Sequence, residues 1–440
     1  MKLSIDLKKH FKFILAVGFL LLPLIWANAE TAADLQNKIN QKDSDIEILE
    51  REIAQYQNEL NTIGNQKNTL AGEIKKLDVT KKKLLADINV TQKKIDKTNF
   101  TISSLSTDIG DKEVSISTNI ESIKMGIRAT NEFEQNSMIG VLLSEGDFAT
   151  AWNDIDNMMT IRDRIRENIA TLRTVKGQLE DTRTVTVKAK EDLVKLKSQL
   201  SDQQKIVVQN TNEKNKLLAQ TKNSEAAYQK LLKDRIAKRD AFEKELRDYE
   251  AQLQFILDPS KLPTSGVLSW PLDSVYVTQL FGKTVDSKRL YASGSHSGVD
   301  FRAAVGTPVR AMADGKVLGI GDTDQTCPGA SFGKFVFIEY NNGLSSAFGH
   351  LSLIKSQEGN FVKRGDIVGY SGATGHVTGP HLHVSLYASQ GVKMTSKPSA
   401  ACDGRIYRIP AAPSNGYLDA MYYLPPYKVN TTILVNNPKE

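Results

Sequence analysis

A heptad-like repeat of apolar residues constrains the fold of this 440-residue chain more than any other feature. From Ala32 to about Leu257, proline and glycine are rare and charged or amide residues are frequent. Apolar residues recur there at alternating steps of three and four, which predicts coiled-coil helices. The first series comprises Leu35, Ile39, Ile46, Leu49, Ile53, Tyr56, Leu60, Ile63, Leu70, Ile74, Leu77, Leu84, Ile88, Ile95, Ile102, Leu105, Ile109, Ile116, Ile120, Ile123 and Ile127. Unbroken, this helix would be roughly 140 Å long, although Asn, Thr and Lys at seam positions predict local breaks.

The repeat is interrupted between about 131 and 160, where Phe148 and Trp152 accompany two glycines. A second heptad-like stretch runs from Ile161 to about Leu257. We therefore expect a coiled-coil domain over 30–257 with a compact break near 131–160. Two long helices joined in this way can form an antiparallel hairpin, and a parallel homodimer is the alternative. The apolar residues of the break belong either to the core of the bend or to a docking surface.

The periodicity changes after DPSKLPTSG, residues 258–266, whose two prolines and glycine predict a linker. The stretches VYVTQL (275–280), KVLGI (316–320), KFVFIEY (334–340) and HLHVSLY (381–387) have strand character and are separated by turn residues. The predicted fold class is α + β multidomain. A long α-helical coiled coil is followed over 267–440 by a mostly antiparallel β-sandwich or barrel-like domain with a C-terminal extension.

The N-terminus has the form of a secretory signal peptide over residues 1–29. Four lysines precede the apolar run FILAVGFLLLPLIW, and Ala27-Asn28-Ala29 is a small-x-small cleavage pattern. A retained N-terminal membrane anchor is the alternative. The formal net charge of +6 is mild for this length and does not indicate a nucleic-acid-binding protein. We expect an exported protein, periplasmic or extracellular and associated with the cell wall.

Two cysteines, Cys327 and Cys402, both lie in the β part of the chain. In an oxidising compartment an isolated pair is a candidate disulfide, and two unpaired thiols are the alternative. A bridge would connect two long loops beside the predicted cleft.

Five of the six histidines lie in the predicted β domain. His381 and His383 stand at i and i+2 of a predicted strand, so their imidazoles share one face. His296 and Asp300 lie four residues apart in HSGVD. A catalytic zinc site takes about three protein ligands and an open position, which these two motifs can supply together. The helical zinc-protease motif HExxH is absent.

Together and in this order, the motifs resemble those of lysostaphin-type (LytM-like) zinc metallopeptidases, which cut peptide bonds in peptidoglycan. The resemblance covers about 120 residues and rests on WPLDSVYVTQLFG, HSGVDFRAAVGTPVRAMADGKV, FGKFVFIEYNNGLSSAFGHLS, VKRGDIVGYSGATG and TGPHLHV. It implies one Zn²⁺ per catalytic domain, with His296, Asp300 and His383 as the metal ligands. His350 and His381 are the implied catalytic residues. The helical part resembles, by composition, the coiled coils of cell-division peptidoglycan hydrolases and amidase activators.

Three positions qualify the resemblance. Phe348 stands where the family usually has Tyr, a difference that we expect to leave the chemistry unaffected. Val384-Ser385 follows the HLH motif where the family often has Phe-Glu, which alters the support of the metal ligand. His376 lies outside the family pattern, and we expect it at the rim of the cleft without a required role.

The resemblance implies a zinc endopeptidase that hydrolyses the peptide cross-links of peptidoglycan during wall remodelling or daughter-cell separation. The alternative function is a non-catalytic activator of a cell-wall amidase, because some relatives have lost their metal ligands; here the ligand set is intact. A structural spacer that tethers a wall-binding domain is a third possibility. We also hypothesise that the coiled coil regulates the site or recruits it to a membrane-protein or division-complex partner. The sequence leaves the oligomeric state open.

Overall fold

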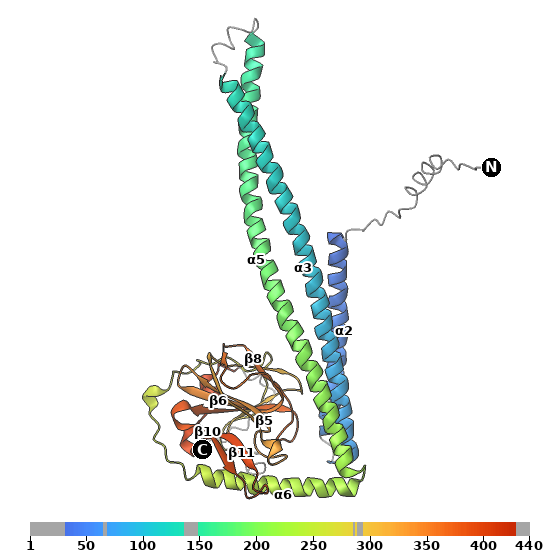
Figure 1. The fold of residues 1–440 in the computed structure, drawn as a ribbon, viewed down its shortest axis with the longest axis vertical. Helices are drawn as coiled ribbons and strands as arrows, with labels where there is room; N and C mark the ends of the chain where they lie inside the picture. Colours follow the sequence, from blue (N-terminus) through green and yellow to red (C-terminus); the bar gives the residue numbers. More distant parts are fainter. Residues whose placement is uncertain (1–30, 65–67, 136–147, 285–286, 288–293, 428–440) are drawn as a thin grey trace, which may run out of the picture. The chain divides into compact units, whose positions relative to one another are not determined.

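The computed structural model describes residues 31–64, 68–135, 148–284, 287 and 294–427 (Figure 1). Its long helices are α2 (Ala32–Gly64), α3 (Leu70–Gln135), α5 (Phe148–Thr221) and α6 (Glu225–Glu250). The chain divides into two compact units. One contains residues 1–43 and 97–191, and the other contains residues 44–96 and 192–440. None of the helices in the described ranges combines the length and apolar character that a membrane span requires. The predicted signal peptide lies outside the described residues.

Within the first unit, α3 and α5 pair as an antiparallel hairpin. Arg183 of α5 forms an ion pair of 2.7 Å with Glu113 of α3, and the Thr182 hydroxyl donates to Asp108 at 3.1 Å. Closer to the bend, a Cβ added to Gly126 would lie 2.6 Å from the Ile165 side chain, so glycine permits close approach of the helices. Because later residues of α5 meet earlier residues of α3, the structure has the intramolecular hairpin arrangement.

The segment that joins the two helices lies mostly outside the described residues, since 136–147 are not described. Trp152, in the first turns of α5, is 60% exposed. Because the rest of the break lies outside the described residues, both alternatives, the core of the bend and a docking surface, stay predictions.

In the second unit, the first heptad series is divided between two helices rather than forming one rod. The 44–64 part of α2 runs antiparallel to the 70–96 part of α3, with ion pairs of 2.9 Å between Lys93 and Asp45 and 3.2 Å between Lys75 and Glu59. The Thr69 hydroxyl accepts a hydrogen bond from the Gly72 amide at the start of α3. The apolar spacing is the same in both helices, so the repeat alone does not reveal that the chain turns back between them.

The second heptad stretch is also divided, at Lys222 and Asn223. Both residues have positive φ angles, of 48° and 58°, which ends α5. Ser224 then caps α6 by accepting a hydrogen bond from the Ala227 amide. α6 ends at Glu250, seven residues before the predicted helix end at Leu257.

The C-terminal part folds around a large antiparallel sheet, as the alternating sequence pattern predicts. Its main path has the order β1-β2-β9-β6-β5-β4-β7, with β3, β8 and β12 attached to the side, and β10 and β11 form a separate hairpin. The strands are β1 (Val277–Gln279), β2 (Val299–Arg302), β3 (Pro308–Arg310), β4 (Gly315–Asp322), β5 (Lys334–Tyr340), β6 (Leu344–Ile354), β7 (Phe361–Val362), β8 (Ile367–Ser371), β9 (His381–Ala388), β10 (Lys393–Pro398), β11 (Ile406–Ala411) and β12 (Tyr417–Leu418). Short helical turns are η1 (Pro259–Lys261), η2 (Thr323–Gln325), η3 (Ser389–Gly391), η4 (Ser414–Gly416) and α8 (Ala420–Tyr423).

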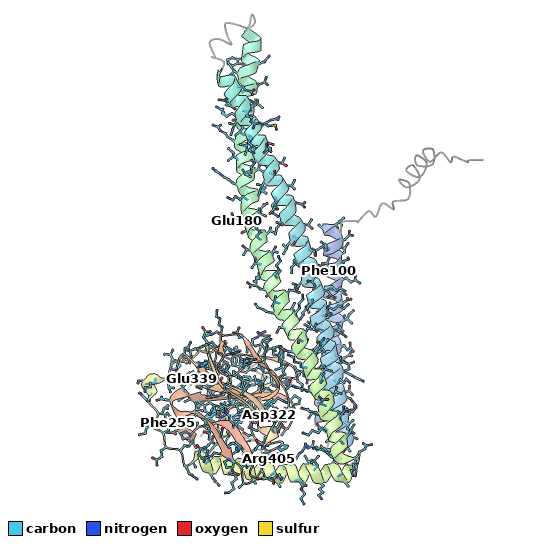
Figure 2. All side chains as sticks on the ribbon, viewed as in Figure 1. Phe100, Glu180, Phe255, Asp322, Glu339 and Arg405 are labelled. Atoms are coloured by element: carbon cyan, nitrogen blue, oxygen red, sulfur yellow. A yellow bond between two sulfur atoms is a disulfide. The ribbon has the colours of Figure 1, made fainter. Side chains whose placement is uncertain are left out.

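Both faces of this sheet are covered, each by its own apolar core. In β5, Val336 and Ile338 contribute to one core, whereas Phe335 and Phe337 contribute to the other. This is the alternation expected of a strand, because successive side chains point to opposite faces. Glu339, labelled in Figure 2, is the exposed member of this strand.

Helix α6 covers part of the second core. Its Phe242 is fully buried and meets the Tyr407 ring edge-on at a centroid distance of 5.0 Å. The same core contains the disulfide between Cys327 and Cys402, both fully buried, which confirms the predicted bridge. We therefore propose that the folded unit that contains the β-sheet begins with α6, ahead of the 258–266 linker.

Truncating this contact tests that boundary. We expect Phe242→Ala to lower the free energy of unfolding of the β domain by about 3–5 kcal/mol, because a buried aromatic ring leaves a cavity. Urea unfolding of the full chain, followed by near-UV circular dichroism, measures the loss. Ile256→Ala is the matched control, since this side chain is 92% exposed and its removal should change stability by less than about 0.5 kcal/mol. Equal stability of the two variants would show that α6 is not part of the folded domain.

Candidate metal centre

The centre is built on two neighbouring antiparallel strands, β2 and β9. Asp300 is the direct cross-strand partner of His383, and Arg302 is the partner of His381. Between them, Phe301 and Leu382 point to the first core. The polar residues of both strands therefore share the opposite face of the sheet.

Three ligand-type atoms converge on this face. His383 Nδ1 lies 2.9 Å from Asp300 Oδ1 and 3.1 Å from His296 Nε2. His296 Nε2 is 3.3 Å from the same carboxylate oxygen. His296 enters from the loop after β1, where its backbone pairs with Gly282. All three side chains are buried and form a group that could hold a metal ion.

In each of the two histidines, one ring nitrogen faces Asp300 and the other faces away from it. The hydrogen-bond partner of the outward nitrogen determines whether the inward nitrogen carries a hydrogen or a lone pair. His296 Nδ1 lies 2.9 Å from the Leu280 carbonyl and so donates its hydrogen there. His383 Nε2 lies 2.8 Å from the Ser385 hydroxyl, which can accept a hydrogen bond. Each ring is then left with a lone pair that faces the Asp300 carboxylate. Three such atoms require a shared proton or a cation, and two imidazoles with one carboxylate are a ligand set typical of catalytic zinc.

Burial and hydrogen bonding set the charges of this group. Burial alone would raise the pKa of Asp300, but its polar contacts with His296 and His383 oppose burial and hold the pKa well below its ordinary value. Burial lowers the pKa of His383, although the Asp300 carboxylate opposes this shift. Asp300 is therefore an anion and His383 a neutral imidazole near neutral pH, which are the forms that bind a metal.

The two predicted catalytic histidines lie beside the ligands. The His350 ring is 4.6 Å from the His381 ring and 5.6 Å from the His383 ring, between centroids. His350 Nδ1 donates to the Thr374 carbonyl at 2.8 Å, and His381 Nδ1 donates to the Gly379 carbonyl at 2.9 Å. The second ring nitrogen of His381, Nε2, lies 3.6 Å from Asp300 Oδ1.

His350 itself is buried and held in an unusual backbone conformation. Its φ angle is 61°, a region that side chains other than glycine rarely adopt, and such strain is common where a side chain must be aimed. Burial lowers the pKa of His350 well below its usual value, and the neighbouring His381 and His383 add to the shift. The ring is therefore neutral near neutral pH.

The structure also places Phe348 and His376, two further residues that the sequence singled out. Phe348 is fully buried in the first core, so the change from Tyr is separated from the chemistry. His376 lies in the loop before β9, where its Nδ1 is 2.6 Å from Glu243 of α6. Sequence reasoning missed the Thr374 carbonyl and Phe332, whose ring lies 5.8 Å from that of His383. Neither has a sequence signal, because loops distant in the chain bring them to the site.

Comparison with known proteins agrees with this geometry. A model of peptidase family M23 matches residues 294–396. The DD-carboxypeptidase/endopeptidase Mpg of Neisseria meningitidis serogroup B is 42% identical over 88 residues, which are 20% of this chain and 19% of that protein. The glycyl-glycine endopeptidase ALE-1 of Staphylococcus capitis is 43% identical over 91 residues, covering 20% of this chain and 24% of that protein.

A third relative extends the match. The peptidoglycan DD-endopeptidase ShyA of Vibrio cholerae is 36% identical over 121 residues, 27% of this chain and 26% of that protein. The chain thus spans about a quarter or less of the length of these relatives, and the similarity concerns the C-terminal domain. The matched segment includes both ligand motifs and the two histidines predicted to be catalytic, His350 and His381. Residues 294–396 are therefore an M23 zinc metallopeptidase domain with the metal-binding group His296, Asp300 and His383, preceded in the chain by long helices.

Proposed function

We propose that this protein is an exported zinc endopeptidase that hydrolyses the peptide cross-links of peptidoglycan. One observation carries the proposal: two inward imidazoles and one carboxylate oxygen lie within 4.8 Å of one another, and the His350 and His381 rings lie beside them. Relatives of known activity are named for peptidoglycan or glycyl-glycine endopeptidase chemistry. An intact ligand set favours catalysis over a purely activating role.

Three side chains would bind the metal, and two others would transfer protons. His296, Asp300 and His383 would hold the zinc, which when bound polarises the scissile carbonyl and acidifies water. Asp300 supplies the negative charge that partly neutralises the dication. Nε2 of His350 and Nε2 of His381 can each accept the proton of the attacking water or return it to the leaving amine. Their Nδ1 hydrogen bonds to main-chain carbonyls fix the ring orientations and tautomers.

Helix α6 supports the proposal that the coiled coil regulates or recruits the enzyme. It covers the same sheet face as the metal ligands, and its Glu243 contacts His376 in the loop beside them. A movement of this helix would be transmitted to the rim of the site. We propose that this coupling serves wall remodelling or daughter-cell separation through a membrane or division-complex partner.

An extracytoplasmic location is consistent with the disulfide between Cys327 and Cys402 and with the cell-wall hydrolase family. We propose that the predicted signal peptide directs this export. Recovery of a mature chain that begins after Ala29 would test cleavage.

Removing one ligand tests the activity. The purified full chain, loaded with zinc, is incubated with cross-linked peptidoglycan, and the released fragments are identified by mass spectrometry. We expect His383→Ala to lower the rate of cross-link cleavage by at least about 100-fold, because the metal loses one of three protein ligands. His376→Ala is the matched control, a histidine of the same domain outside the ligand set, and its rate should not fall. Cleavage that survives in His383→Ala or after chelation would contradict the proposal, and a zinc-loaded chain without activity would favour the amidase-activator alternative.

Ser385 provides a second test, on metal binding alone. Its hydroxyl supports the outward nitrogen of His383, so Ser385→Ala should weaken zinc binding by about 10- to 100-fold. Competition with a chromogenic chelator measures this directly. Ser346→Ala removes another fully buried serine hydroxyl of the same sheet, bonded to Tyr340 rather than to a ligand, and should retain the native zinc affinity. Equal zinc affinities of the two variants would exclude a supporting role for Ser385.

A further inference from the structure

One positively charged side chain at the edge of the metal centre, that of Arg302, is not a metal ligand. Arg302 is the last residue of β2 and lies directly across from His381 of β9. The burial pattern of β2 shows three buried residues followed by an exposed one, so the Arg302 side chain emerges where the buried ligand face meets solvent. Asp300 and Arg302 stand at i and i+2 and therefore point to the same side of the sheet.

The guanidinium group is held in place by an aromatic ring. Arg302 Cζ lies 4.1 Å from the centroid of the Tyr276 ring. The Arg302 amide also donates to the Tyr276 carbonyl at 2.8 Å, which fixes the ring relative to the strand. Stacking on an aromatic face leaves the edge of the guanidinium, with its N–H donors, open to another partner.

Arg302 differs in this respect from the other described arginines of the domain. Arg310 pairs with Asp273, Arg408 pairs with Glu358, and the guanidinium groups of Arg364 and Arg405 donate to main-chain carbonyls. Among the described residues, no hydrogen bond or ion pair is formed by the Arg302 guanidinium. Among the described arginines of the domain, Arg302 is therefore the one with open donors, and its strand position is directly opposite that of His381.

The charges around Arg302 favour an anion. The nearest acidic residue on its strand, Asp300, is buried and already engaged by His296 and His383. A dication held by the ligand group would add further positive charge. A planar arginine with open donors pairs best with a carboxylate, through two parallel hydrogen bonds.

We propose that Arg302 is a specificity residue that binds a carboxylate of the substrate peptide close to the scissile bond. This inference rests on the proposed endopeptidase function and narrows its substrate class. Two residues along a strand span roughly 7 Å, so the carboxylate belongs to a residue within about two positions of the cleaved bond in an extended peptide. Cross-linked stem peptides with a free carboxylate at such a position are preferred over those in which it is amidated.

The test compares two synthetic cross-linked stem peptides that differ only by a free carboxylate or a carboxamide next to the scissile bond. With the zinc-loaded full chain, we expect kcat/KM to be about 10- to 100-fold higher for the free acid, mostly through KM. Arg302→Gln should abolish this preference by weakening cleavage of the free acid alone. Arg302→Lys should retain part of it, because an ammonium keeps the charge but loses the paired geometry. The dissociation constant of the free-acid product peptide, measured without turnover, should be lowest for the native chain, higher for Arg302→Lys and highest for Arg302→Gln.

Matched variants separate substrate binding from general effects. Tyr276→Phe keeps the ring and should keep the preference, whereas Tyr276→Leu should reduce it. Lys393→Gln removes one positive charge from an exposed position on the β10–β11 hairpin and should leave the preference unchanged. Equal cleavage of acid and amide by the native chain, or an equal loss for both in Arg302→Gln, would overturn the role of Arg302 and leave the endopeptidase function standing. Cleavage of neither peptide by the native chain would overturn the endopeptidase function and this inference with it.

Discussion

The register between β2 and β9 is the constraint on which the metal centre depends. Asp300 stands directly opposite His383, so a carboxylate and an imidazole meet across the sheet at 2.9 Å. A slip of one residue would move the ligands to the core face and bring Phe301 and Leu382 to the catalytic face. The apolar alternation of both strands prevents this, because the residues between the ligands are buried in the first core. The packing of the core thus fixes the geometry of the chemistry.

Burial and polar contacts together set the charges of the buried histidines and of Asp300. Removing imidazoles from water favours their neutral forms, which lowers the pKa values of His350 and His383. The same burial would neutralise Asp300, but its polar contacts with His296 and His383 keep it ionised. Near neutral pH, His350 and His383 are therefore neutral imidazoles beside the Asp300 anion. This combination suits a divalent cation, and it leaves Arg302 as the group at the edge of the site that is open to an anionic substrate.

The second face of the sheet connects the enzyme to its helical part. Along β9, His381, His383, Ser385 and Tyr387 share this face, and Tyr387 belongs to the core that contains Phe242 of α6. Tyr417, stacked beside Tyr387, donates a hydrogen bond of 2.7 Å to Glu250 at the end of α6. The catalytic face and the surface covered by α6 are thus continuous. Loss of α6 would expose apolar residues close to the ligands, which gives a physical basis for coupling between helix and site.

The sequence by itself determined the two-part architecture and the identity of the ligands. The heptad series specifies helices because its apolar period matches a helix, and HSGVD with HLH identifies a ligand set because i and i+2 residues of a strand share a face. The two cysteines were likewise predicted to pair, as Cys327 and Cys402 do.

Only the tertiary structure decided how distant segments combine. The reversal between α2 and α3 is invisible to a repeat that continues unchanged on both sides of it. The inclusion of α6 in the β domain depends on Phe242 meeting Tyr407, a contact across 165 residues of chain that no local pattern encodes. The strained φ of His350, its anchor on Thr374 and the open position of Arg302 depend in the same way on loops and strands brought together by folding. Local periodicity determines which residues share a face, whereas long-range packing determines which faces meet.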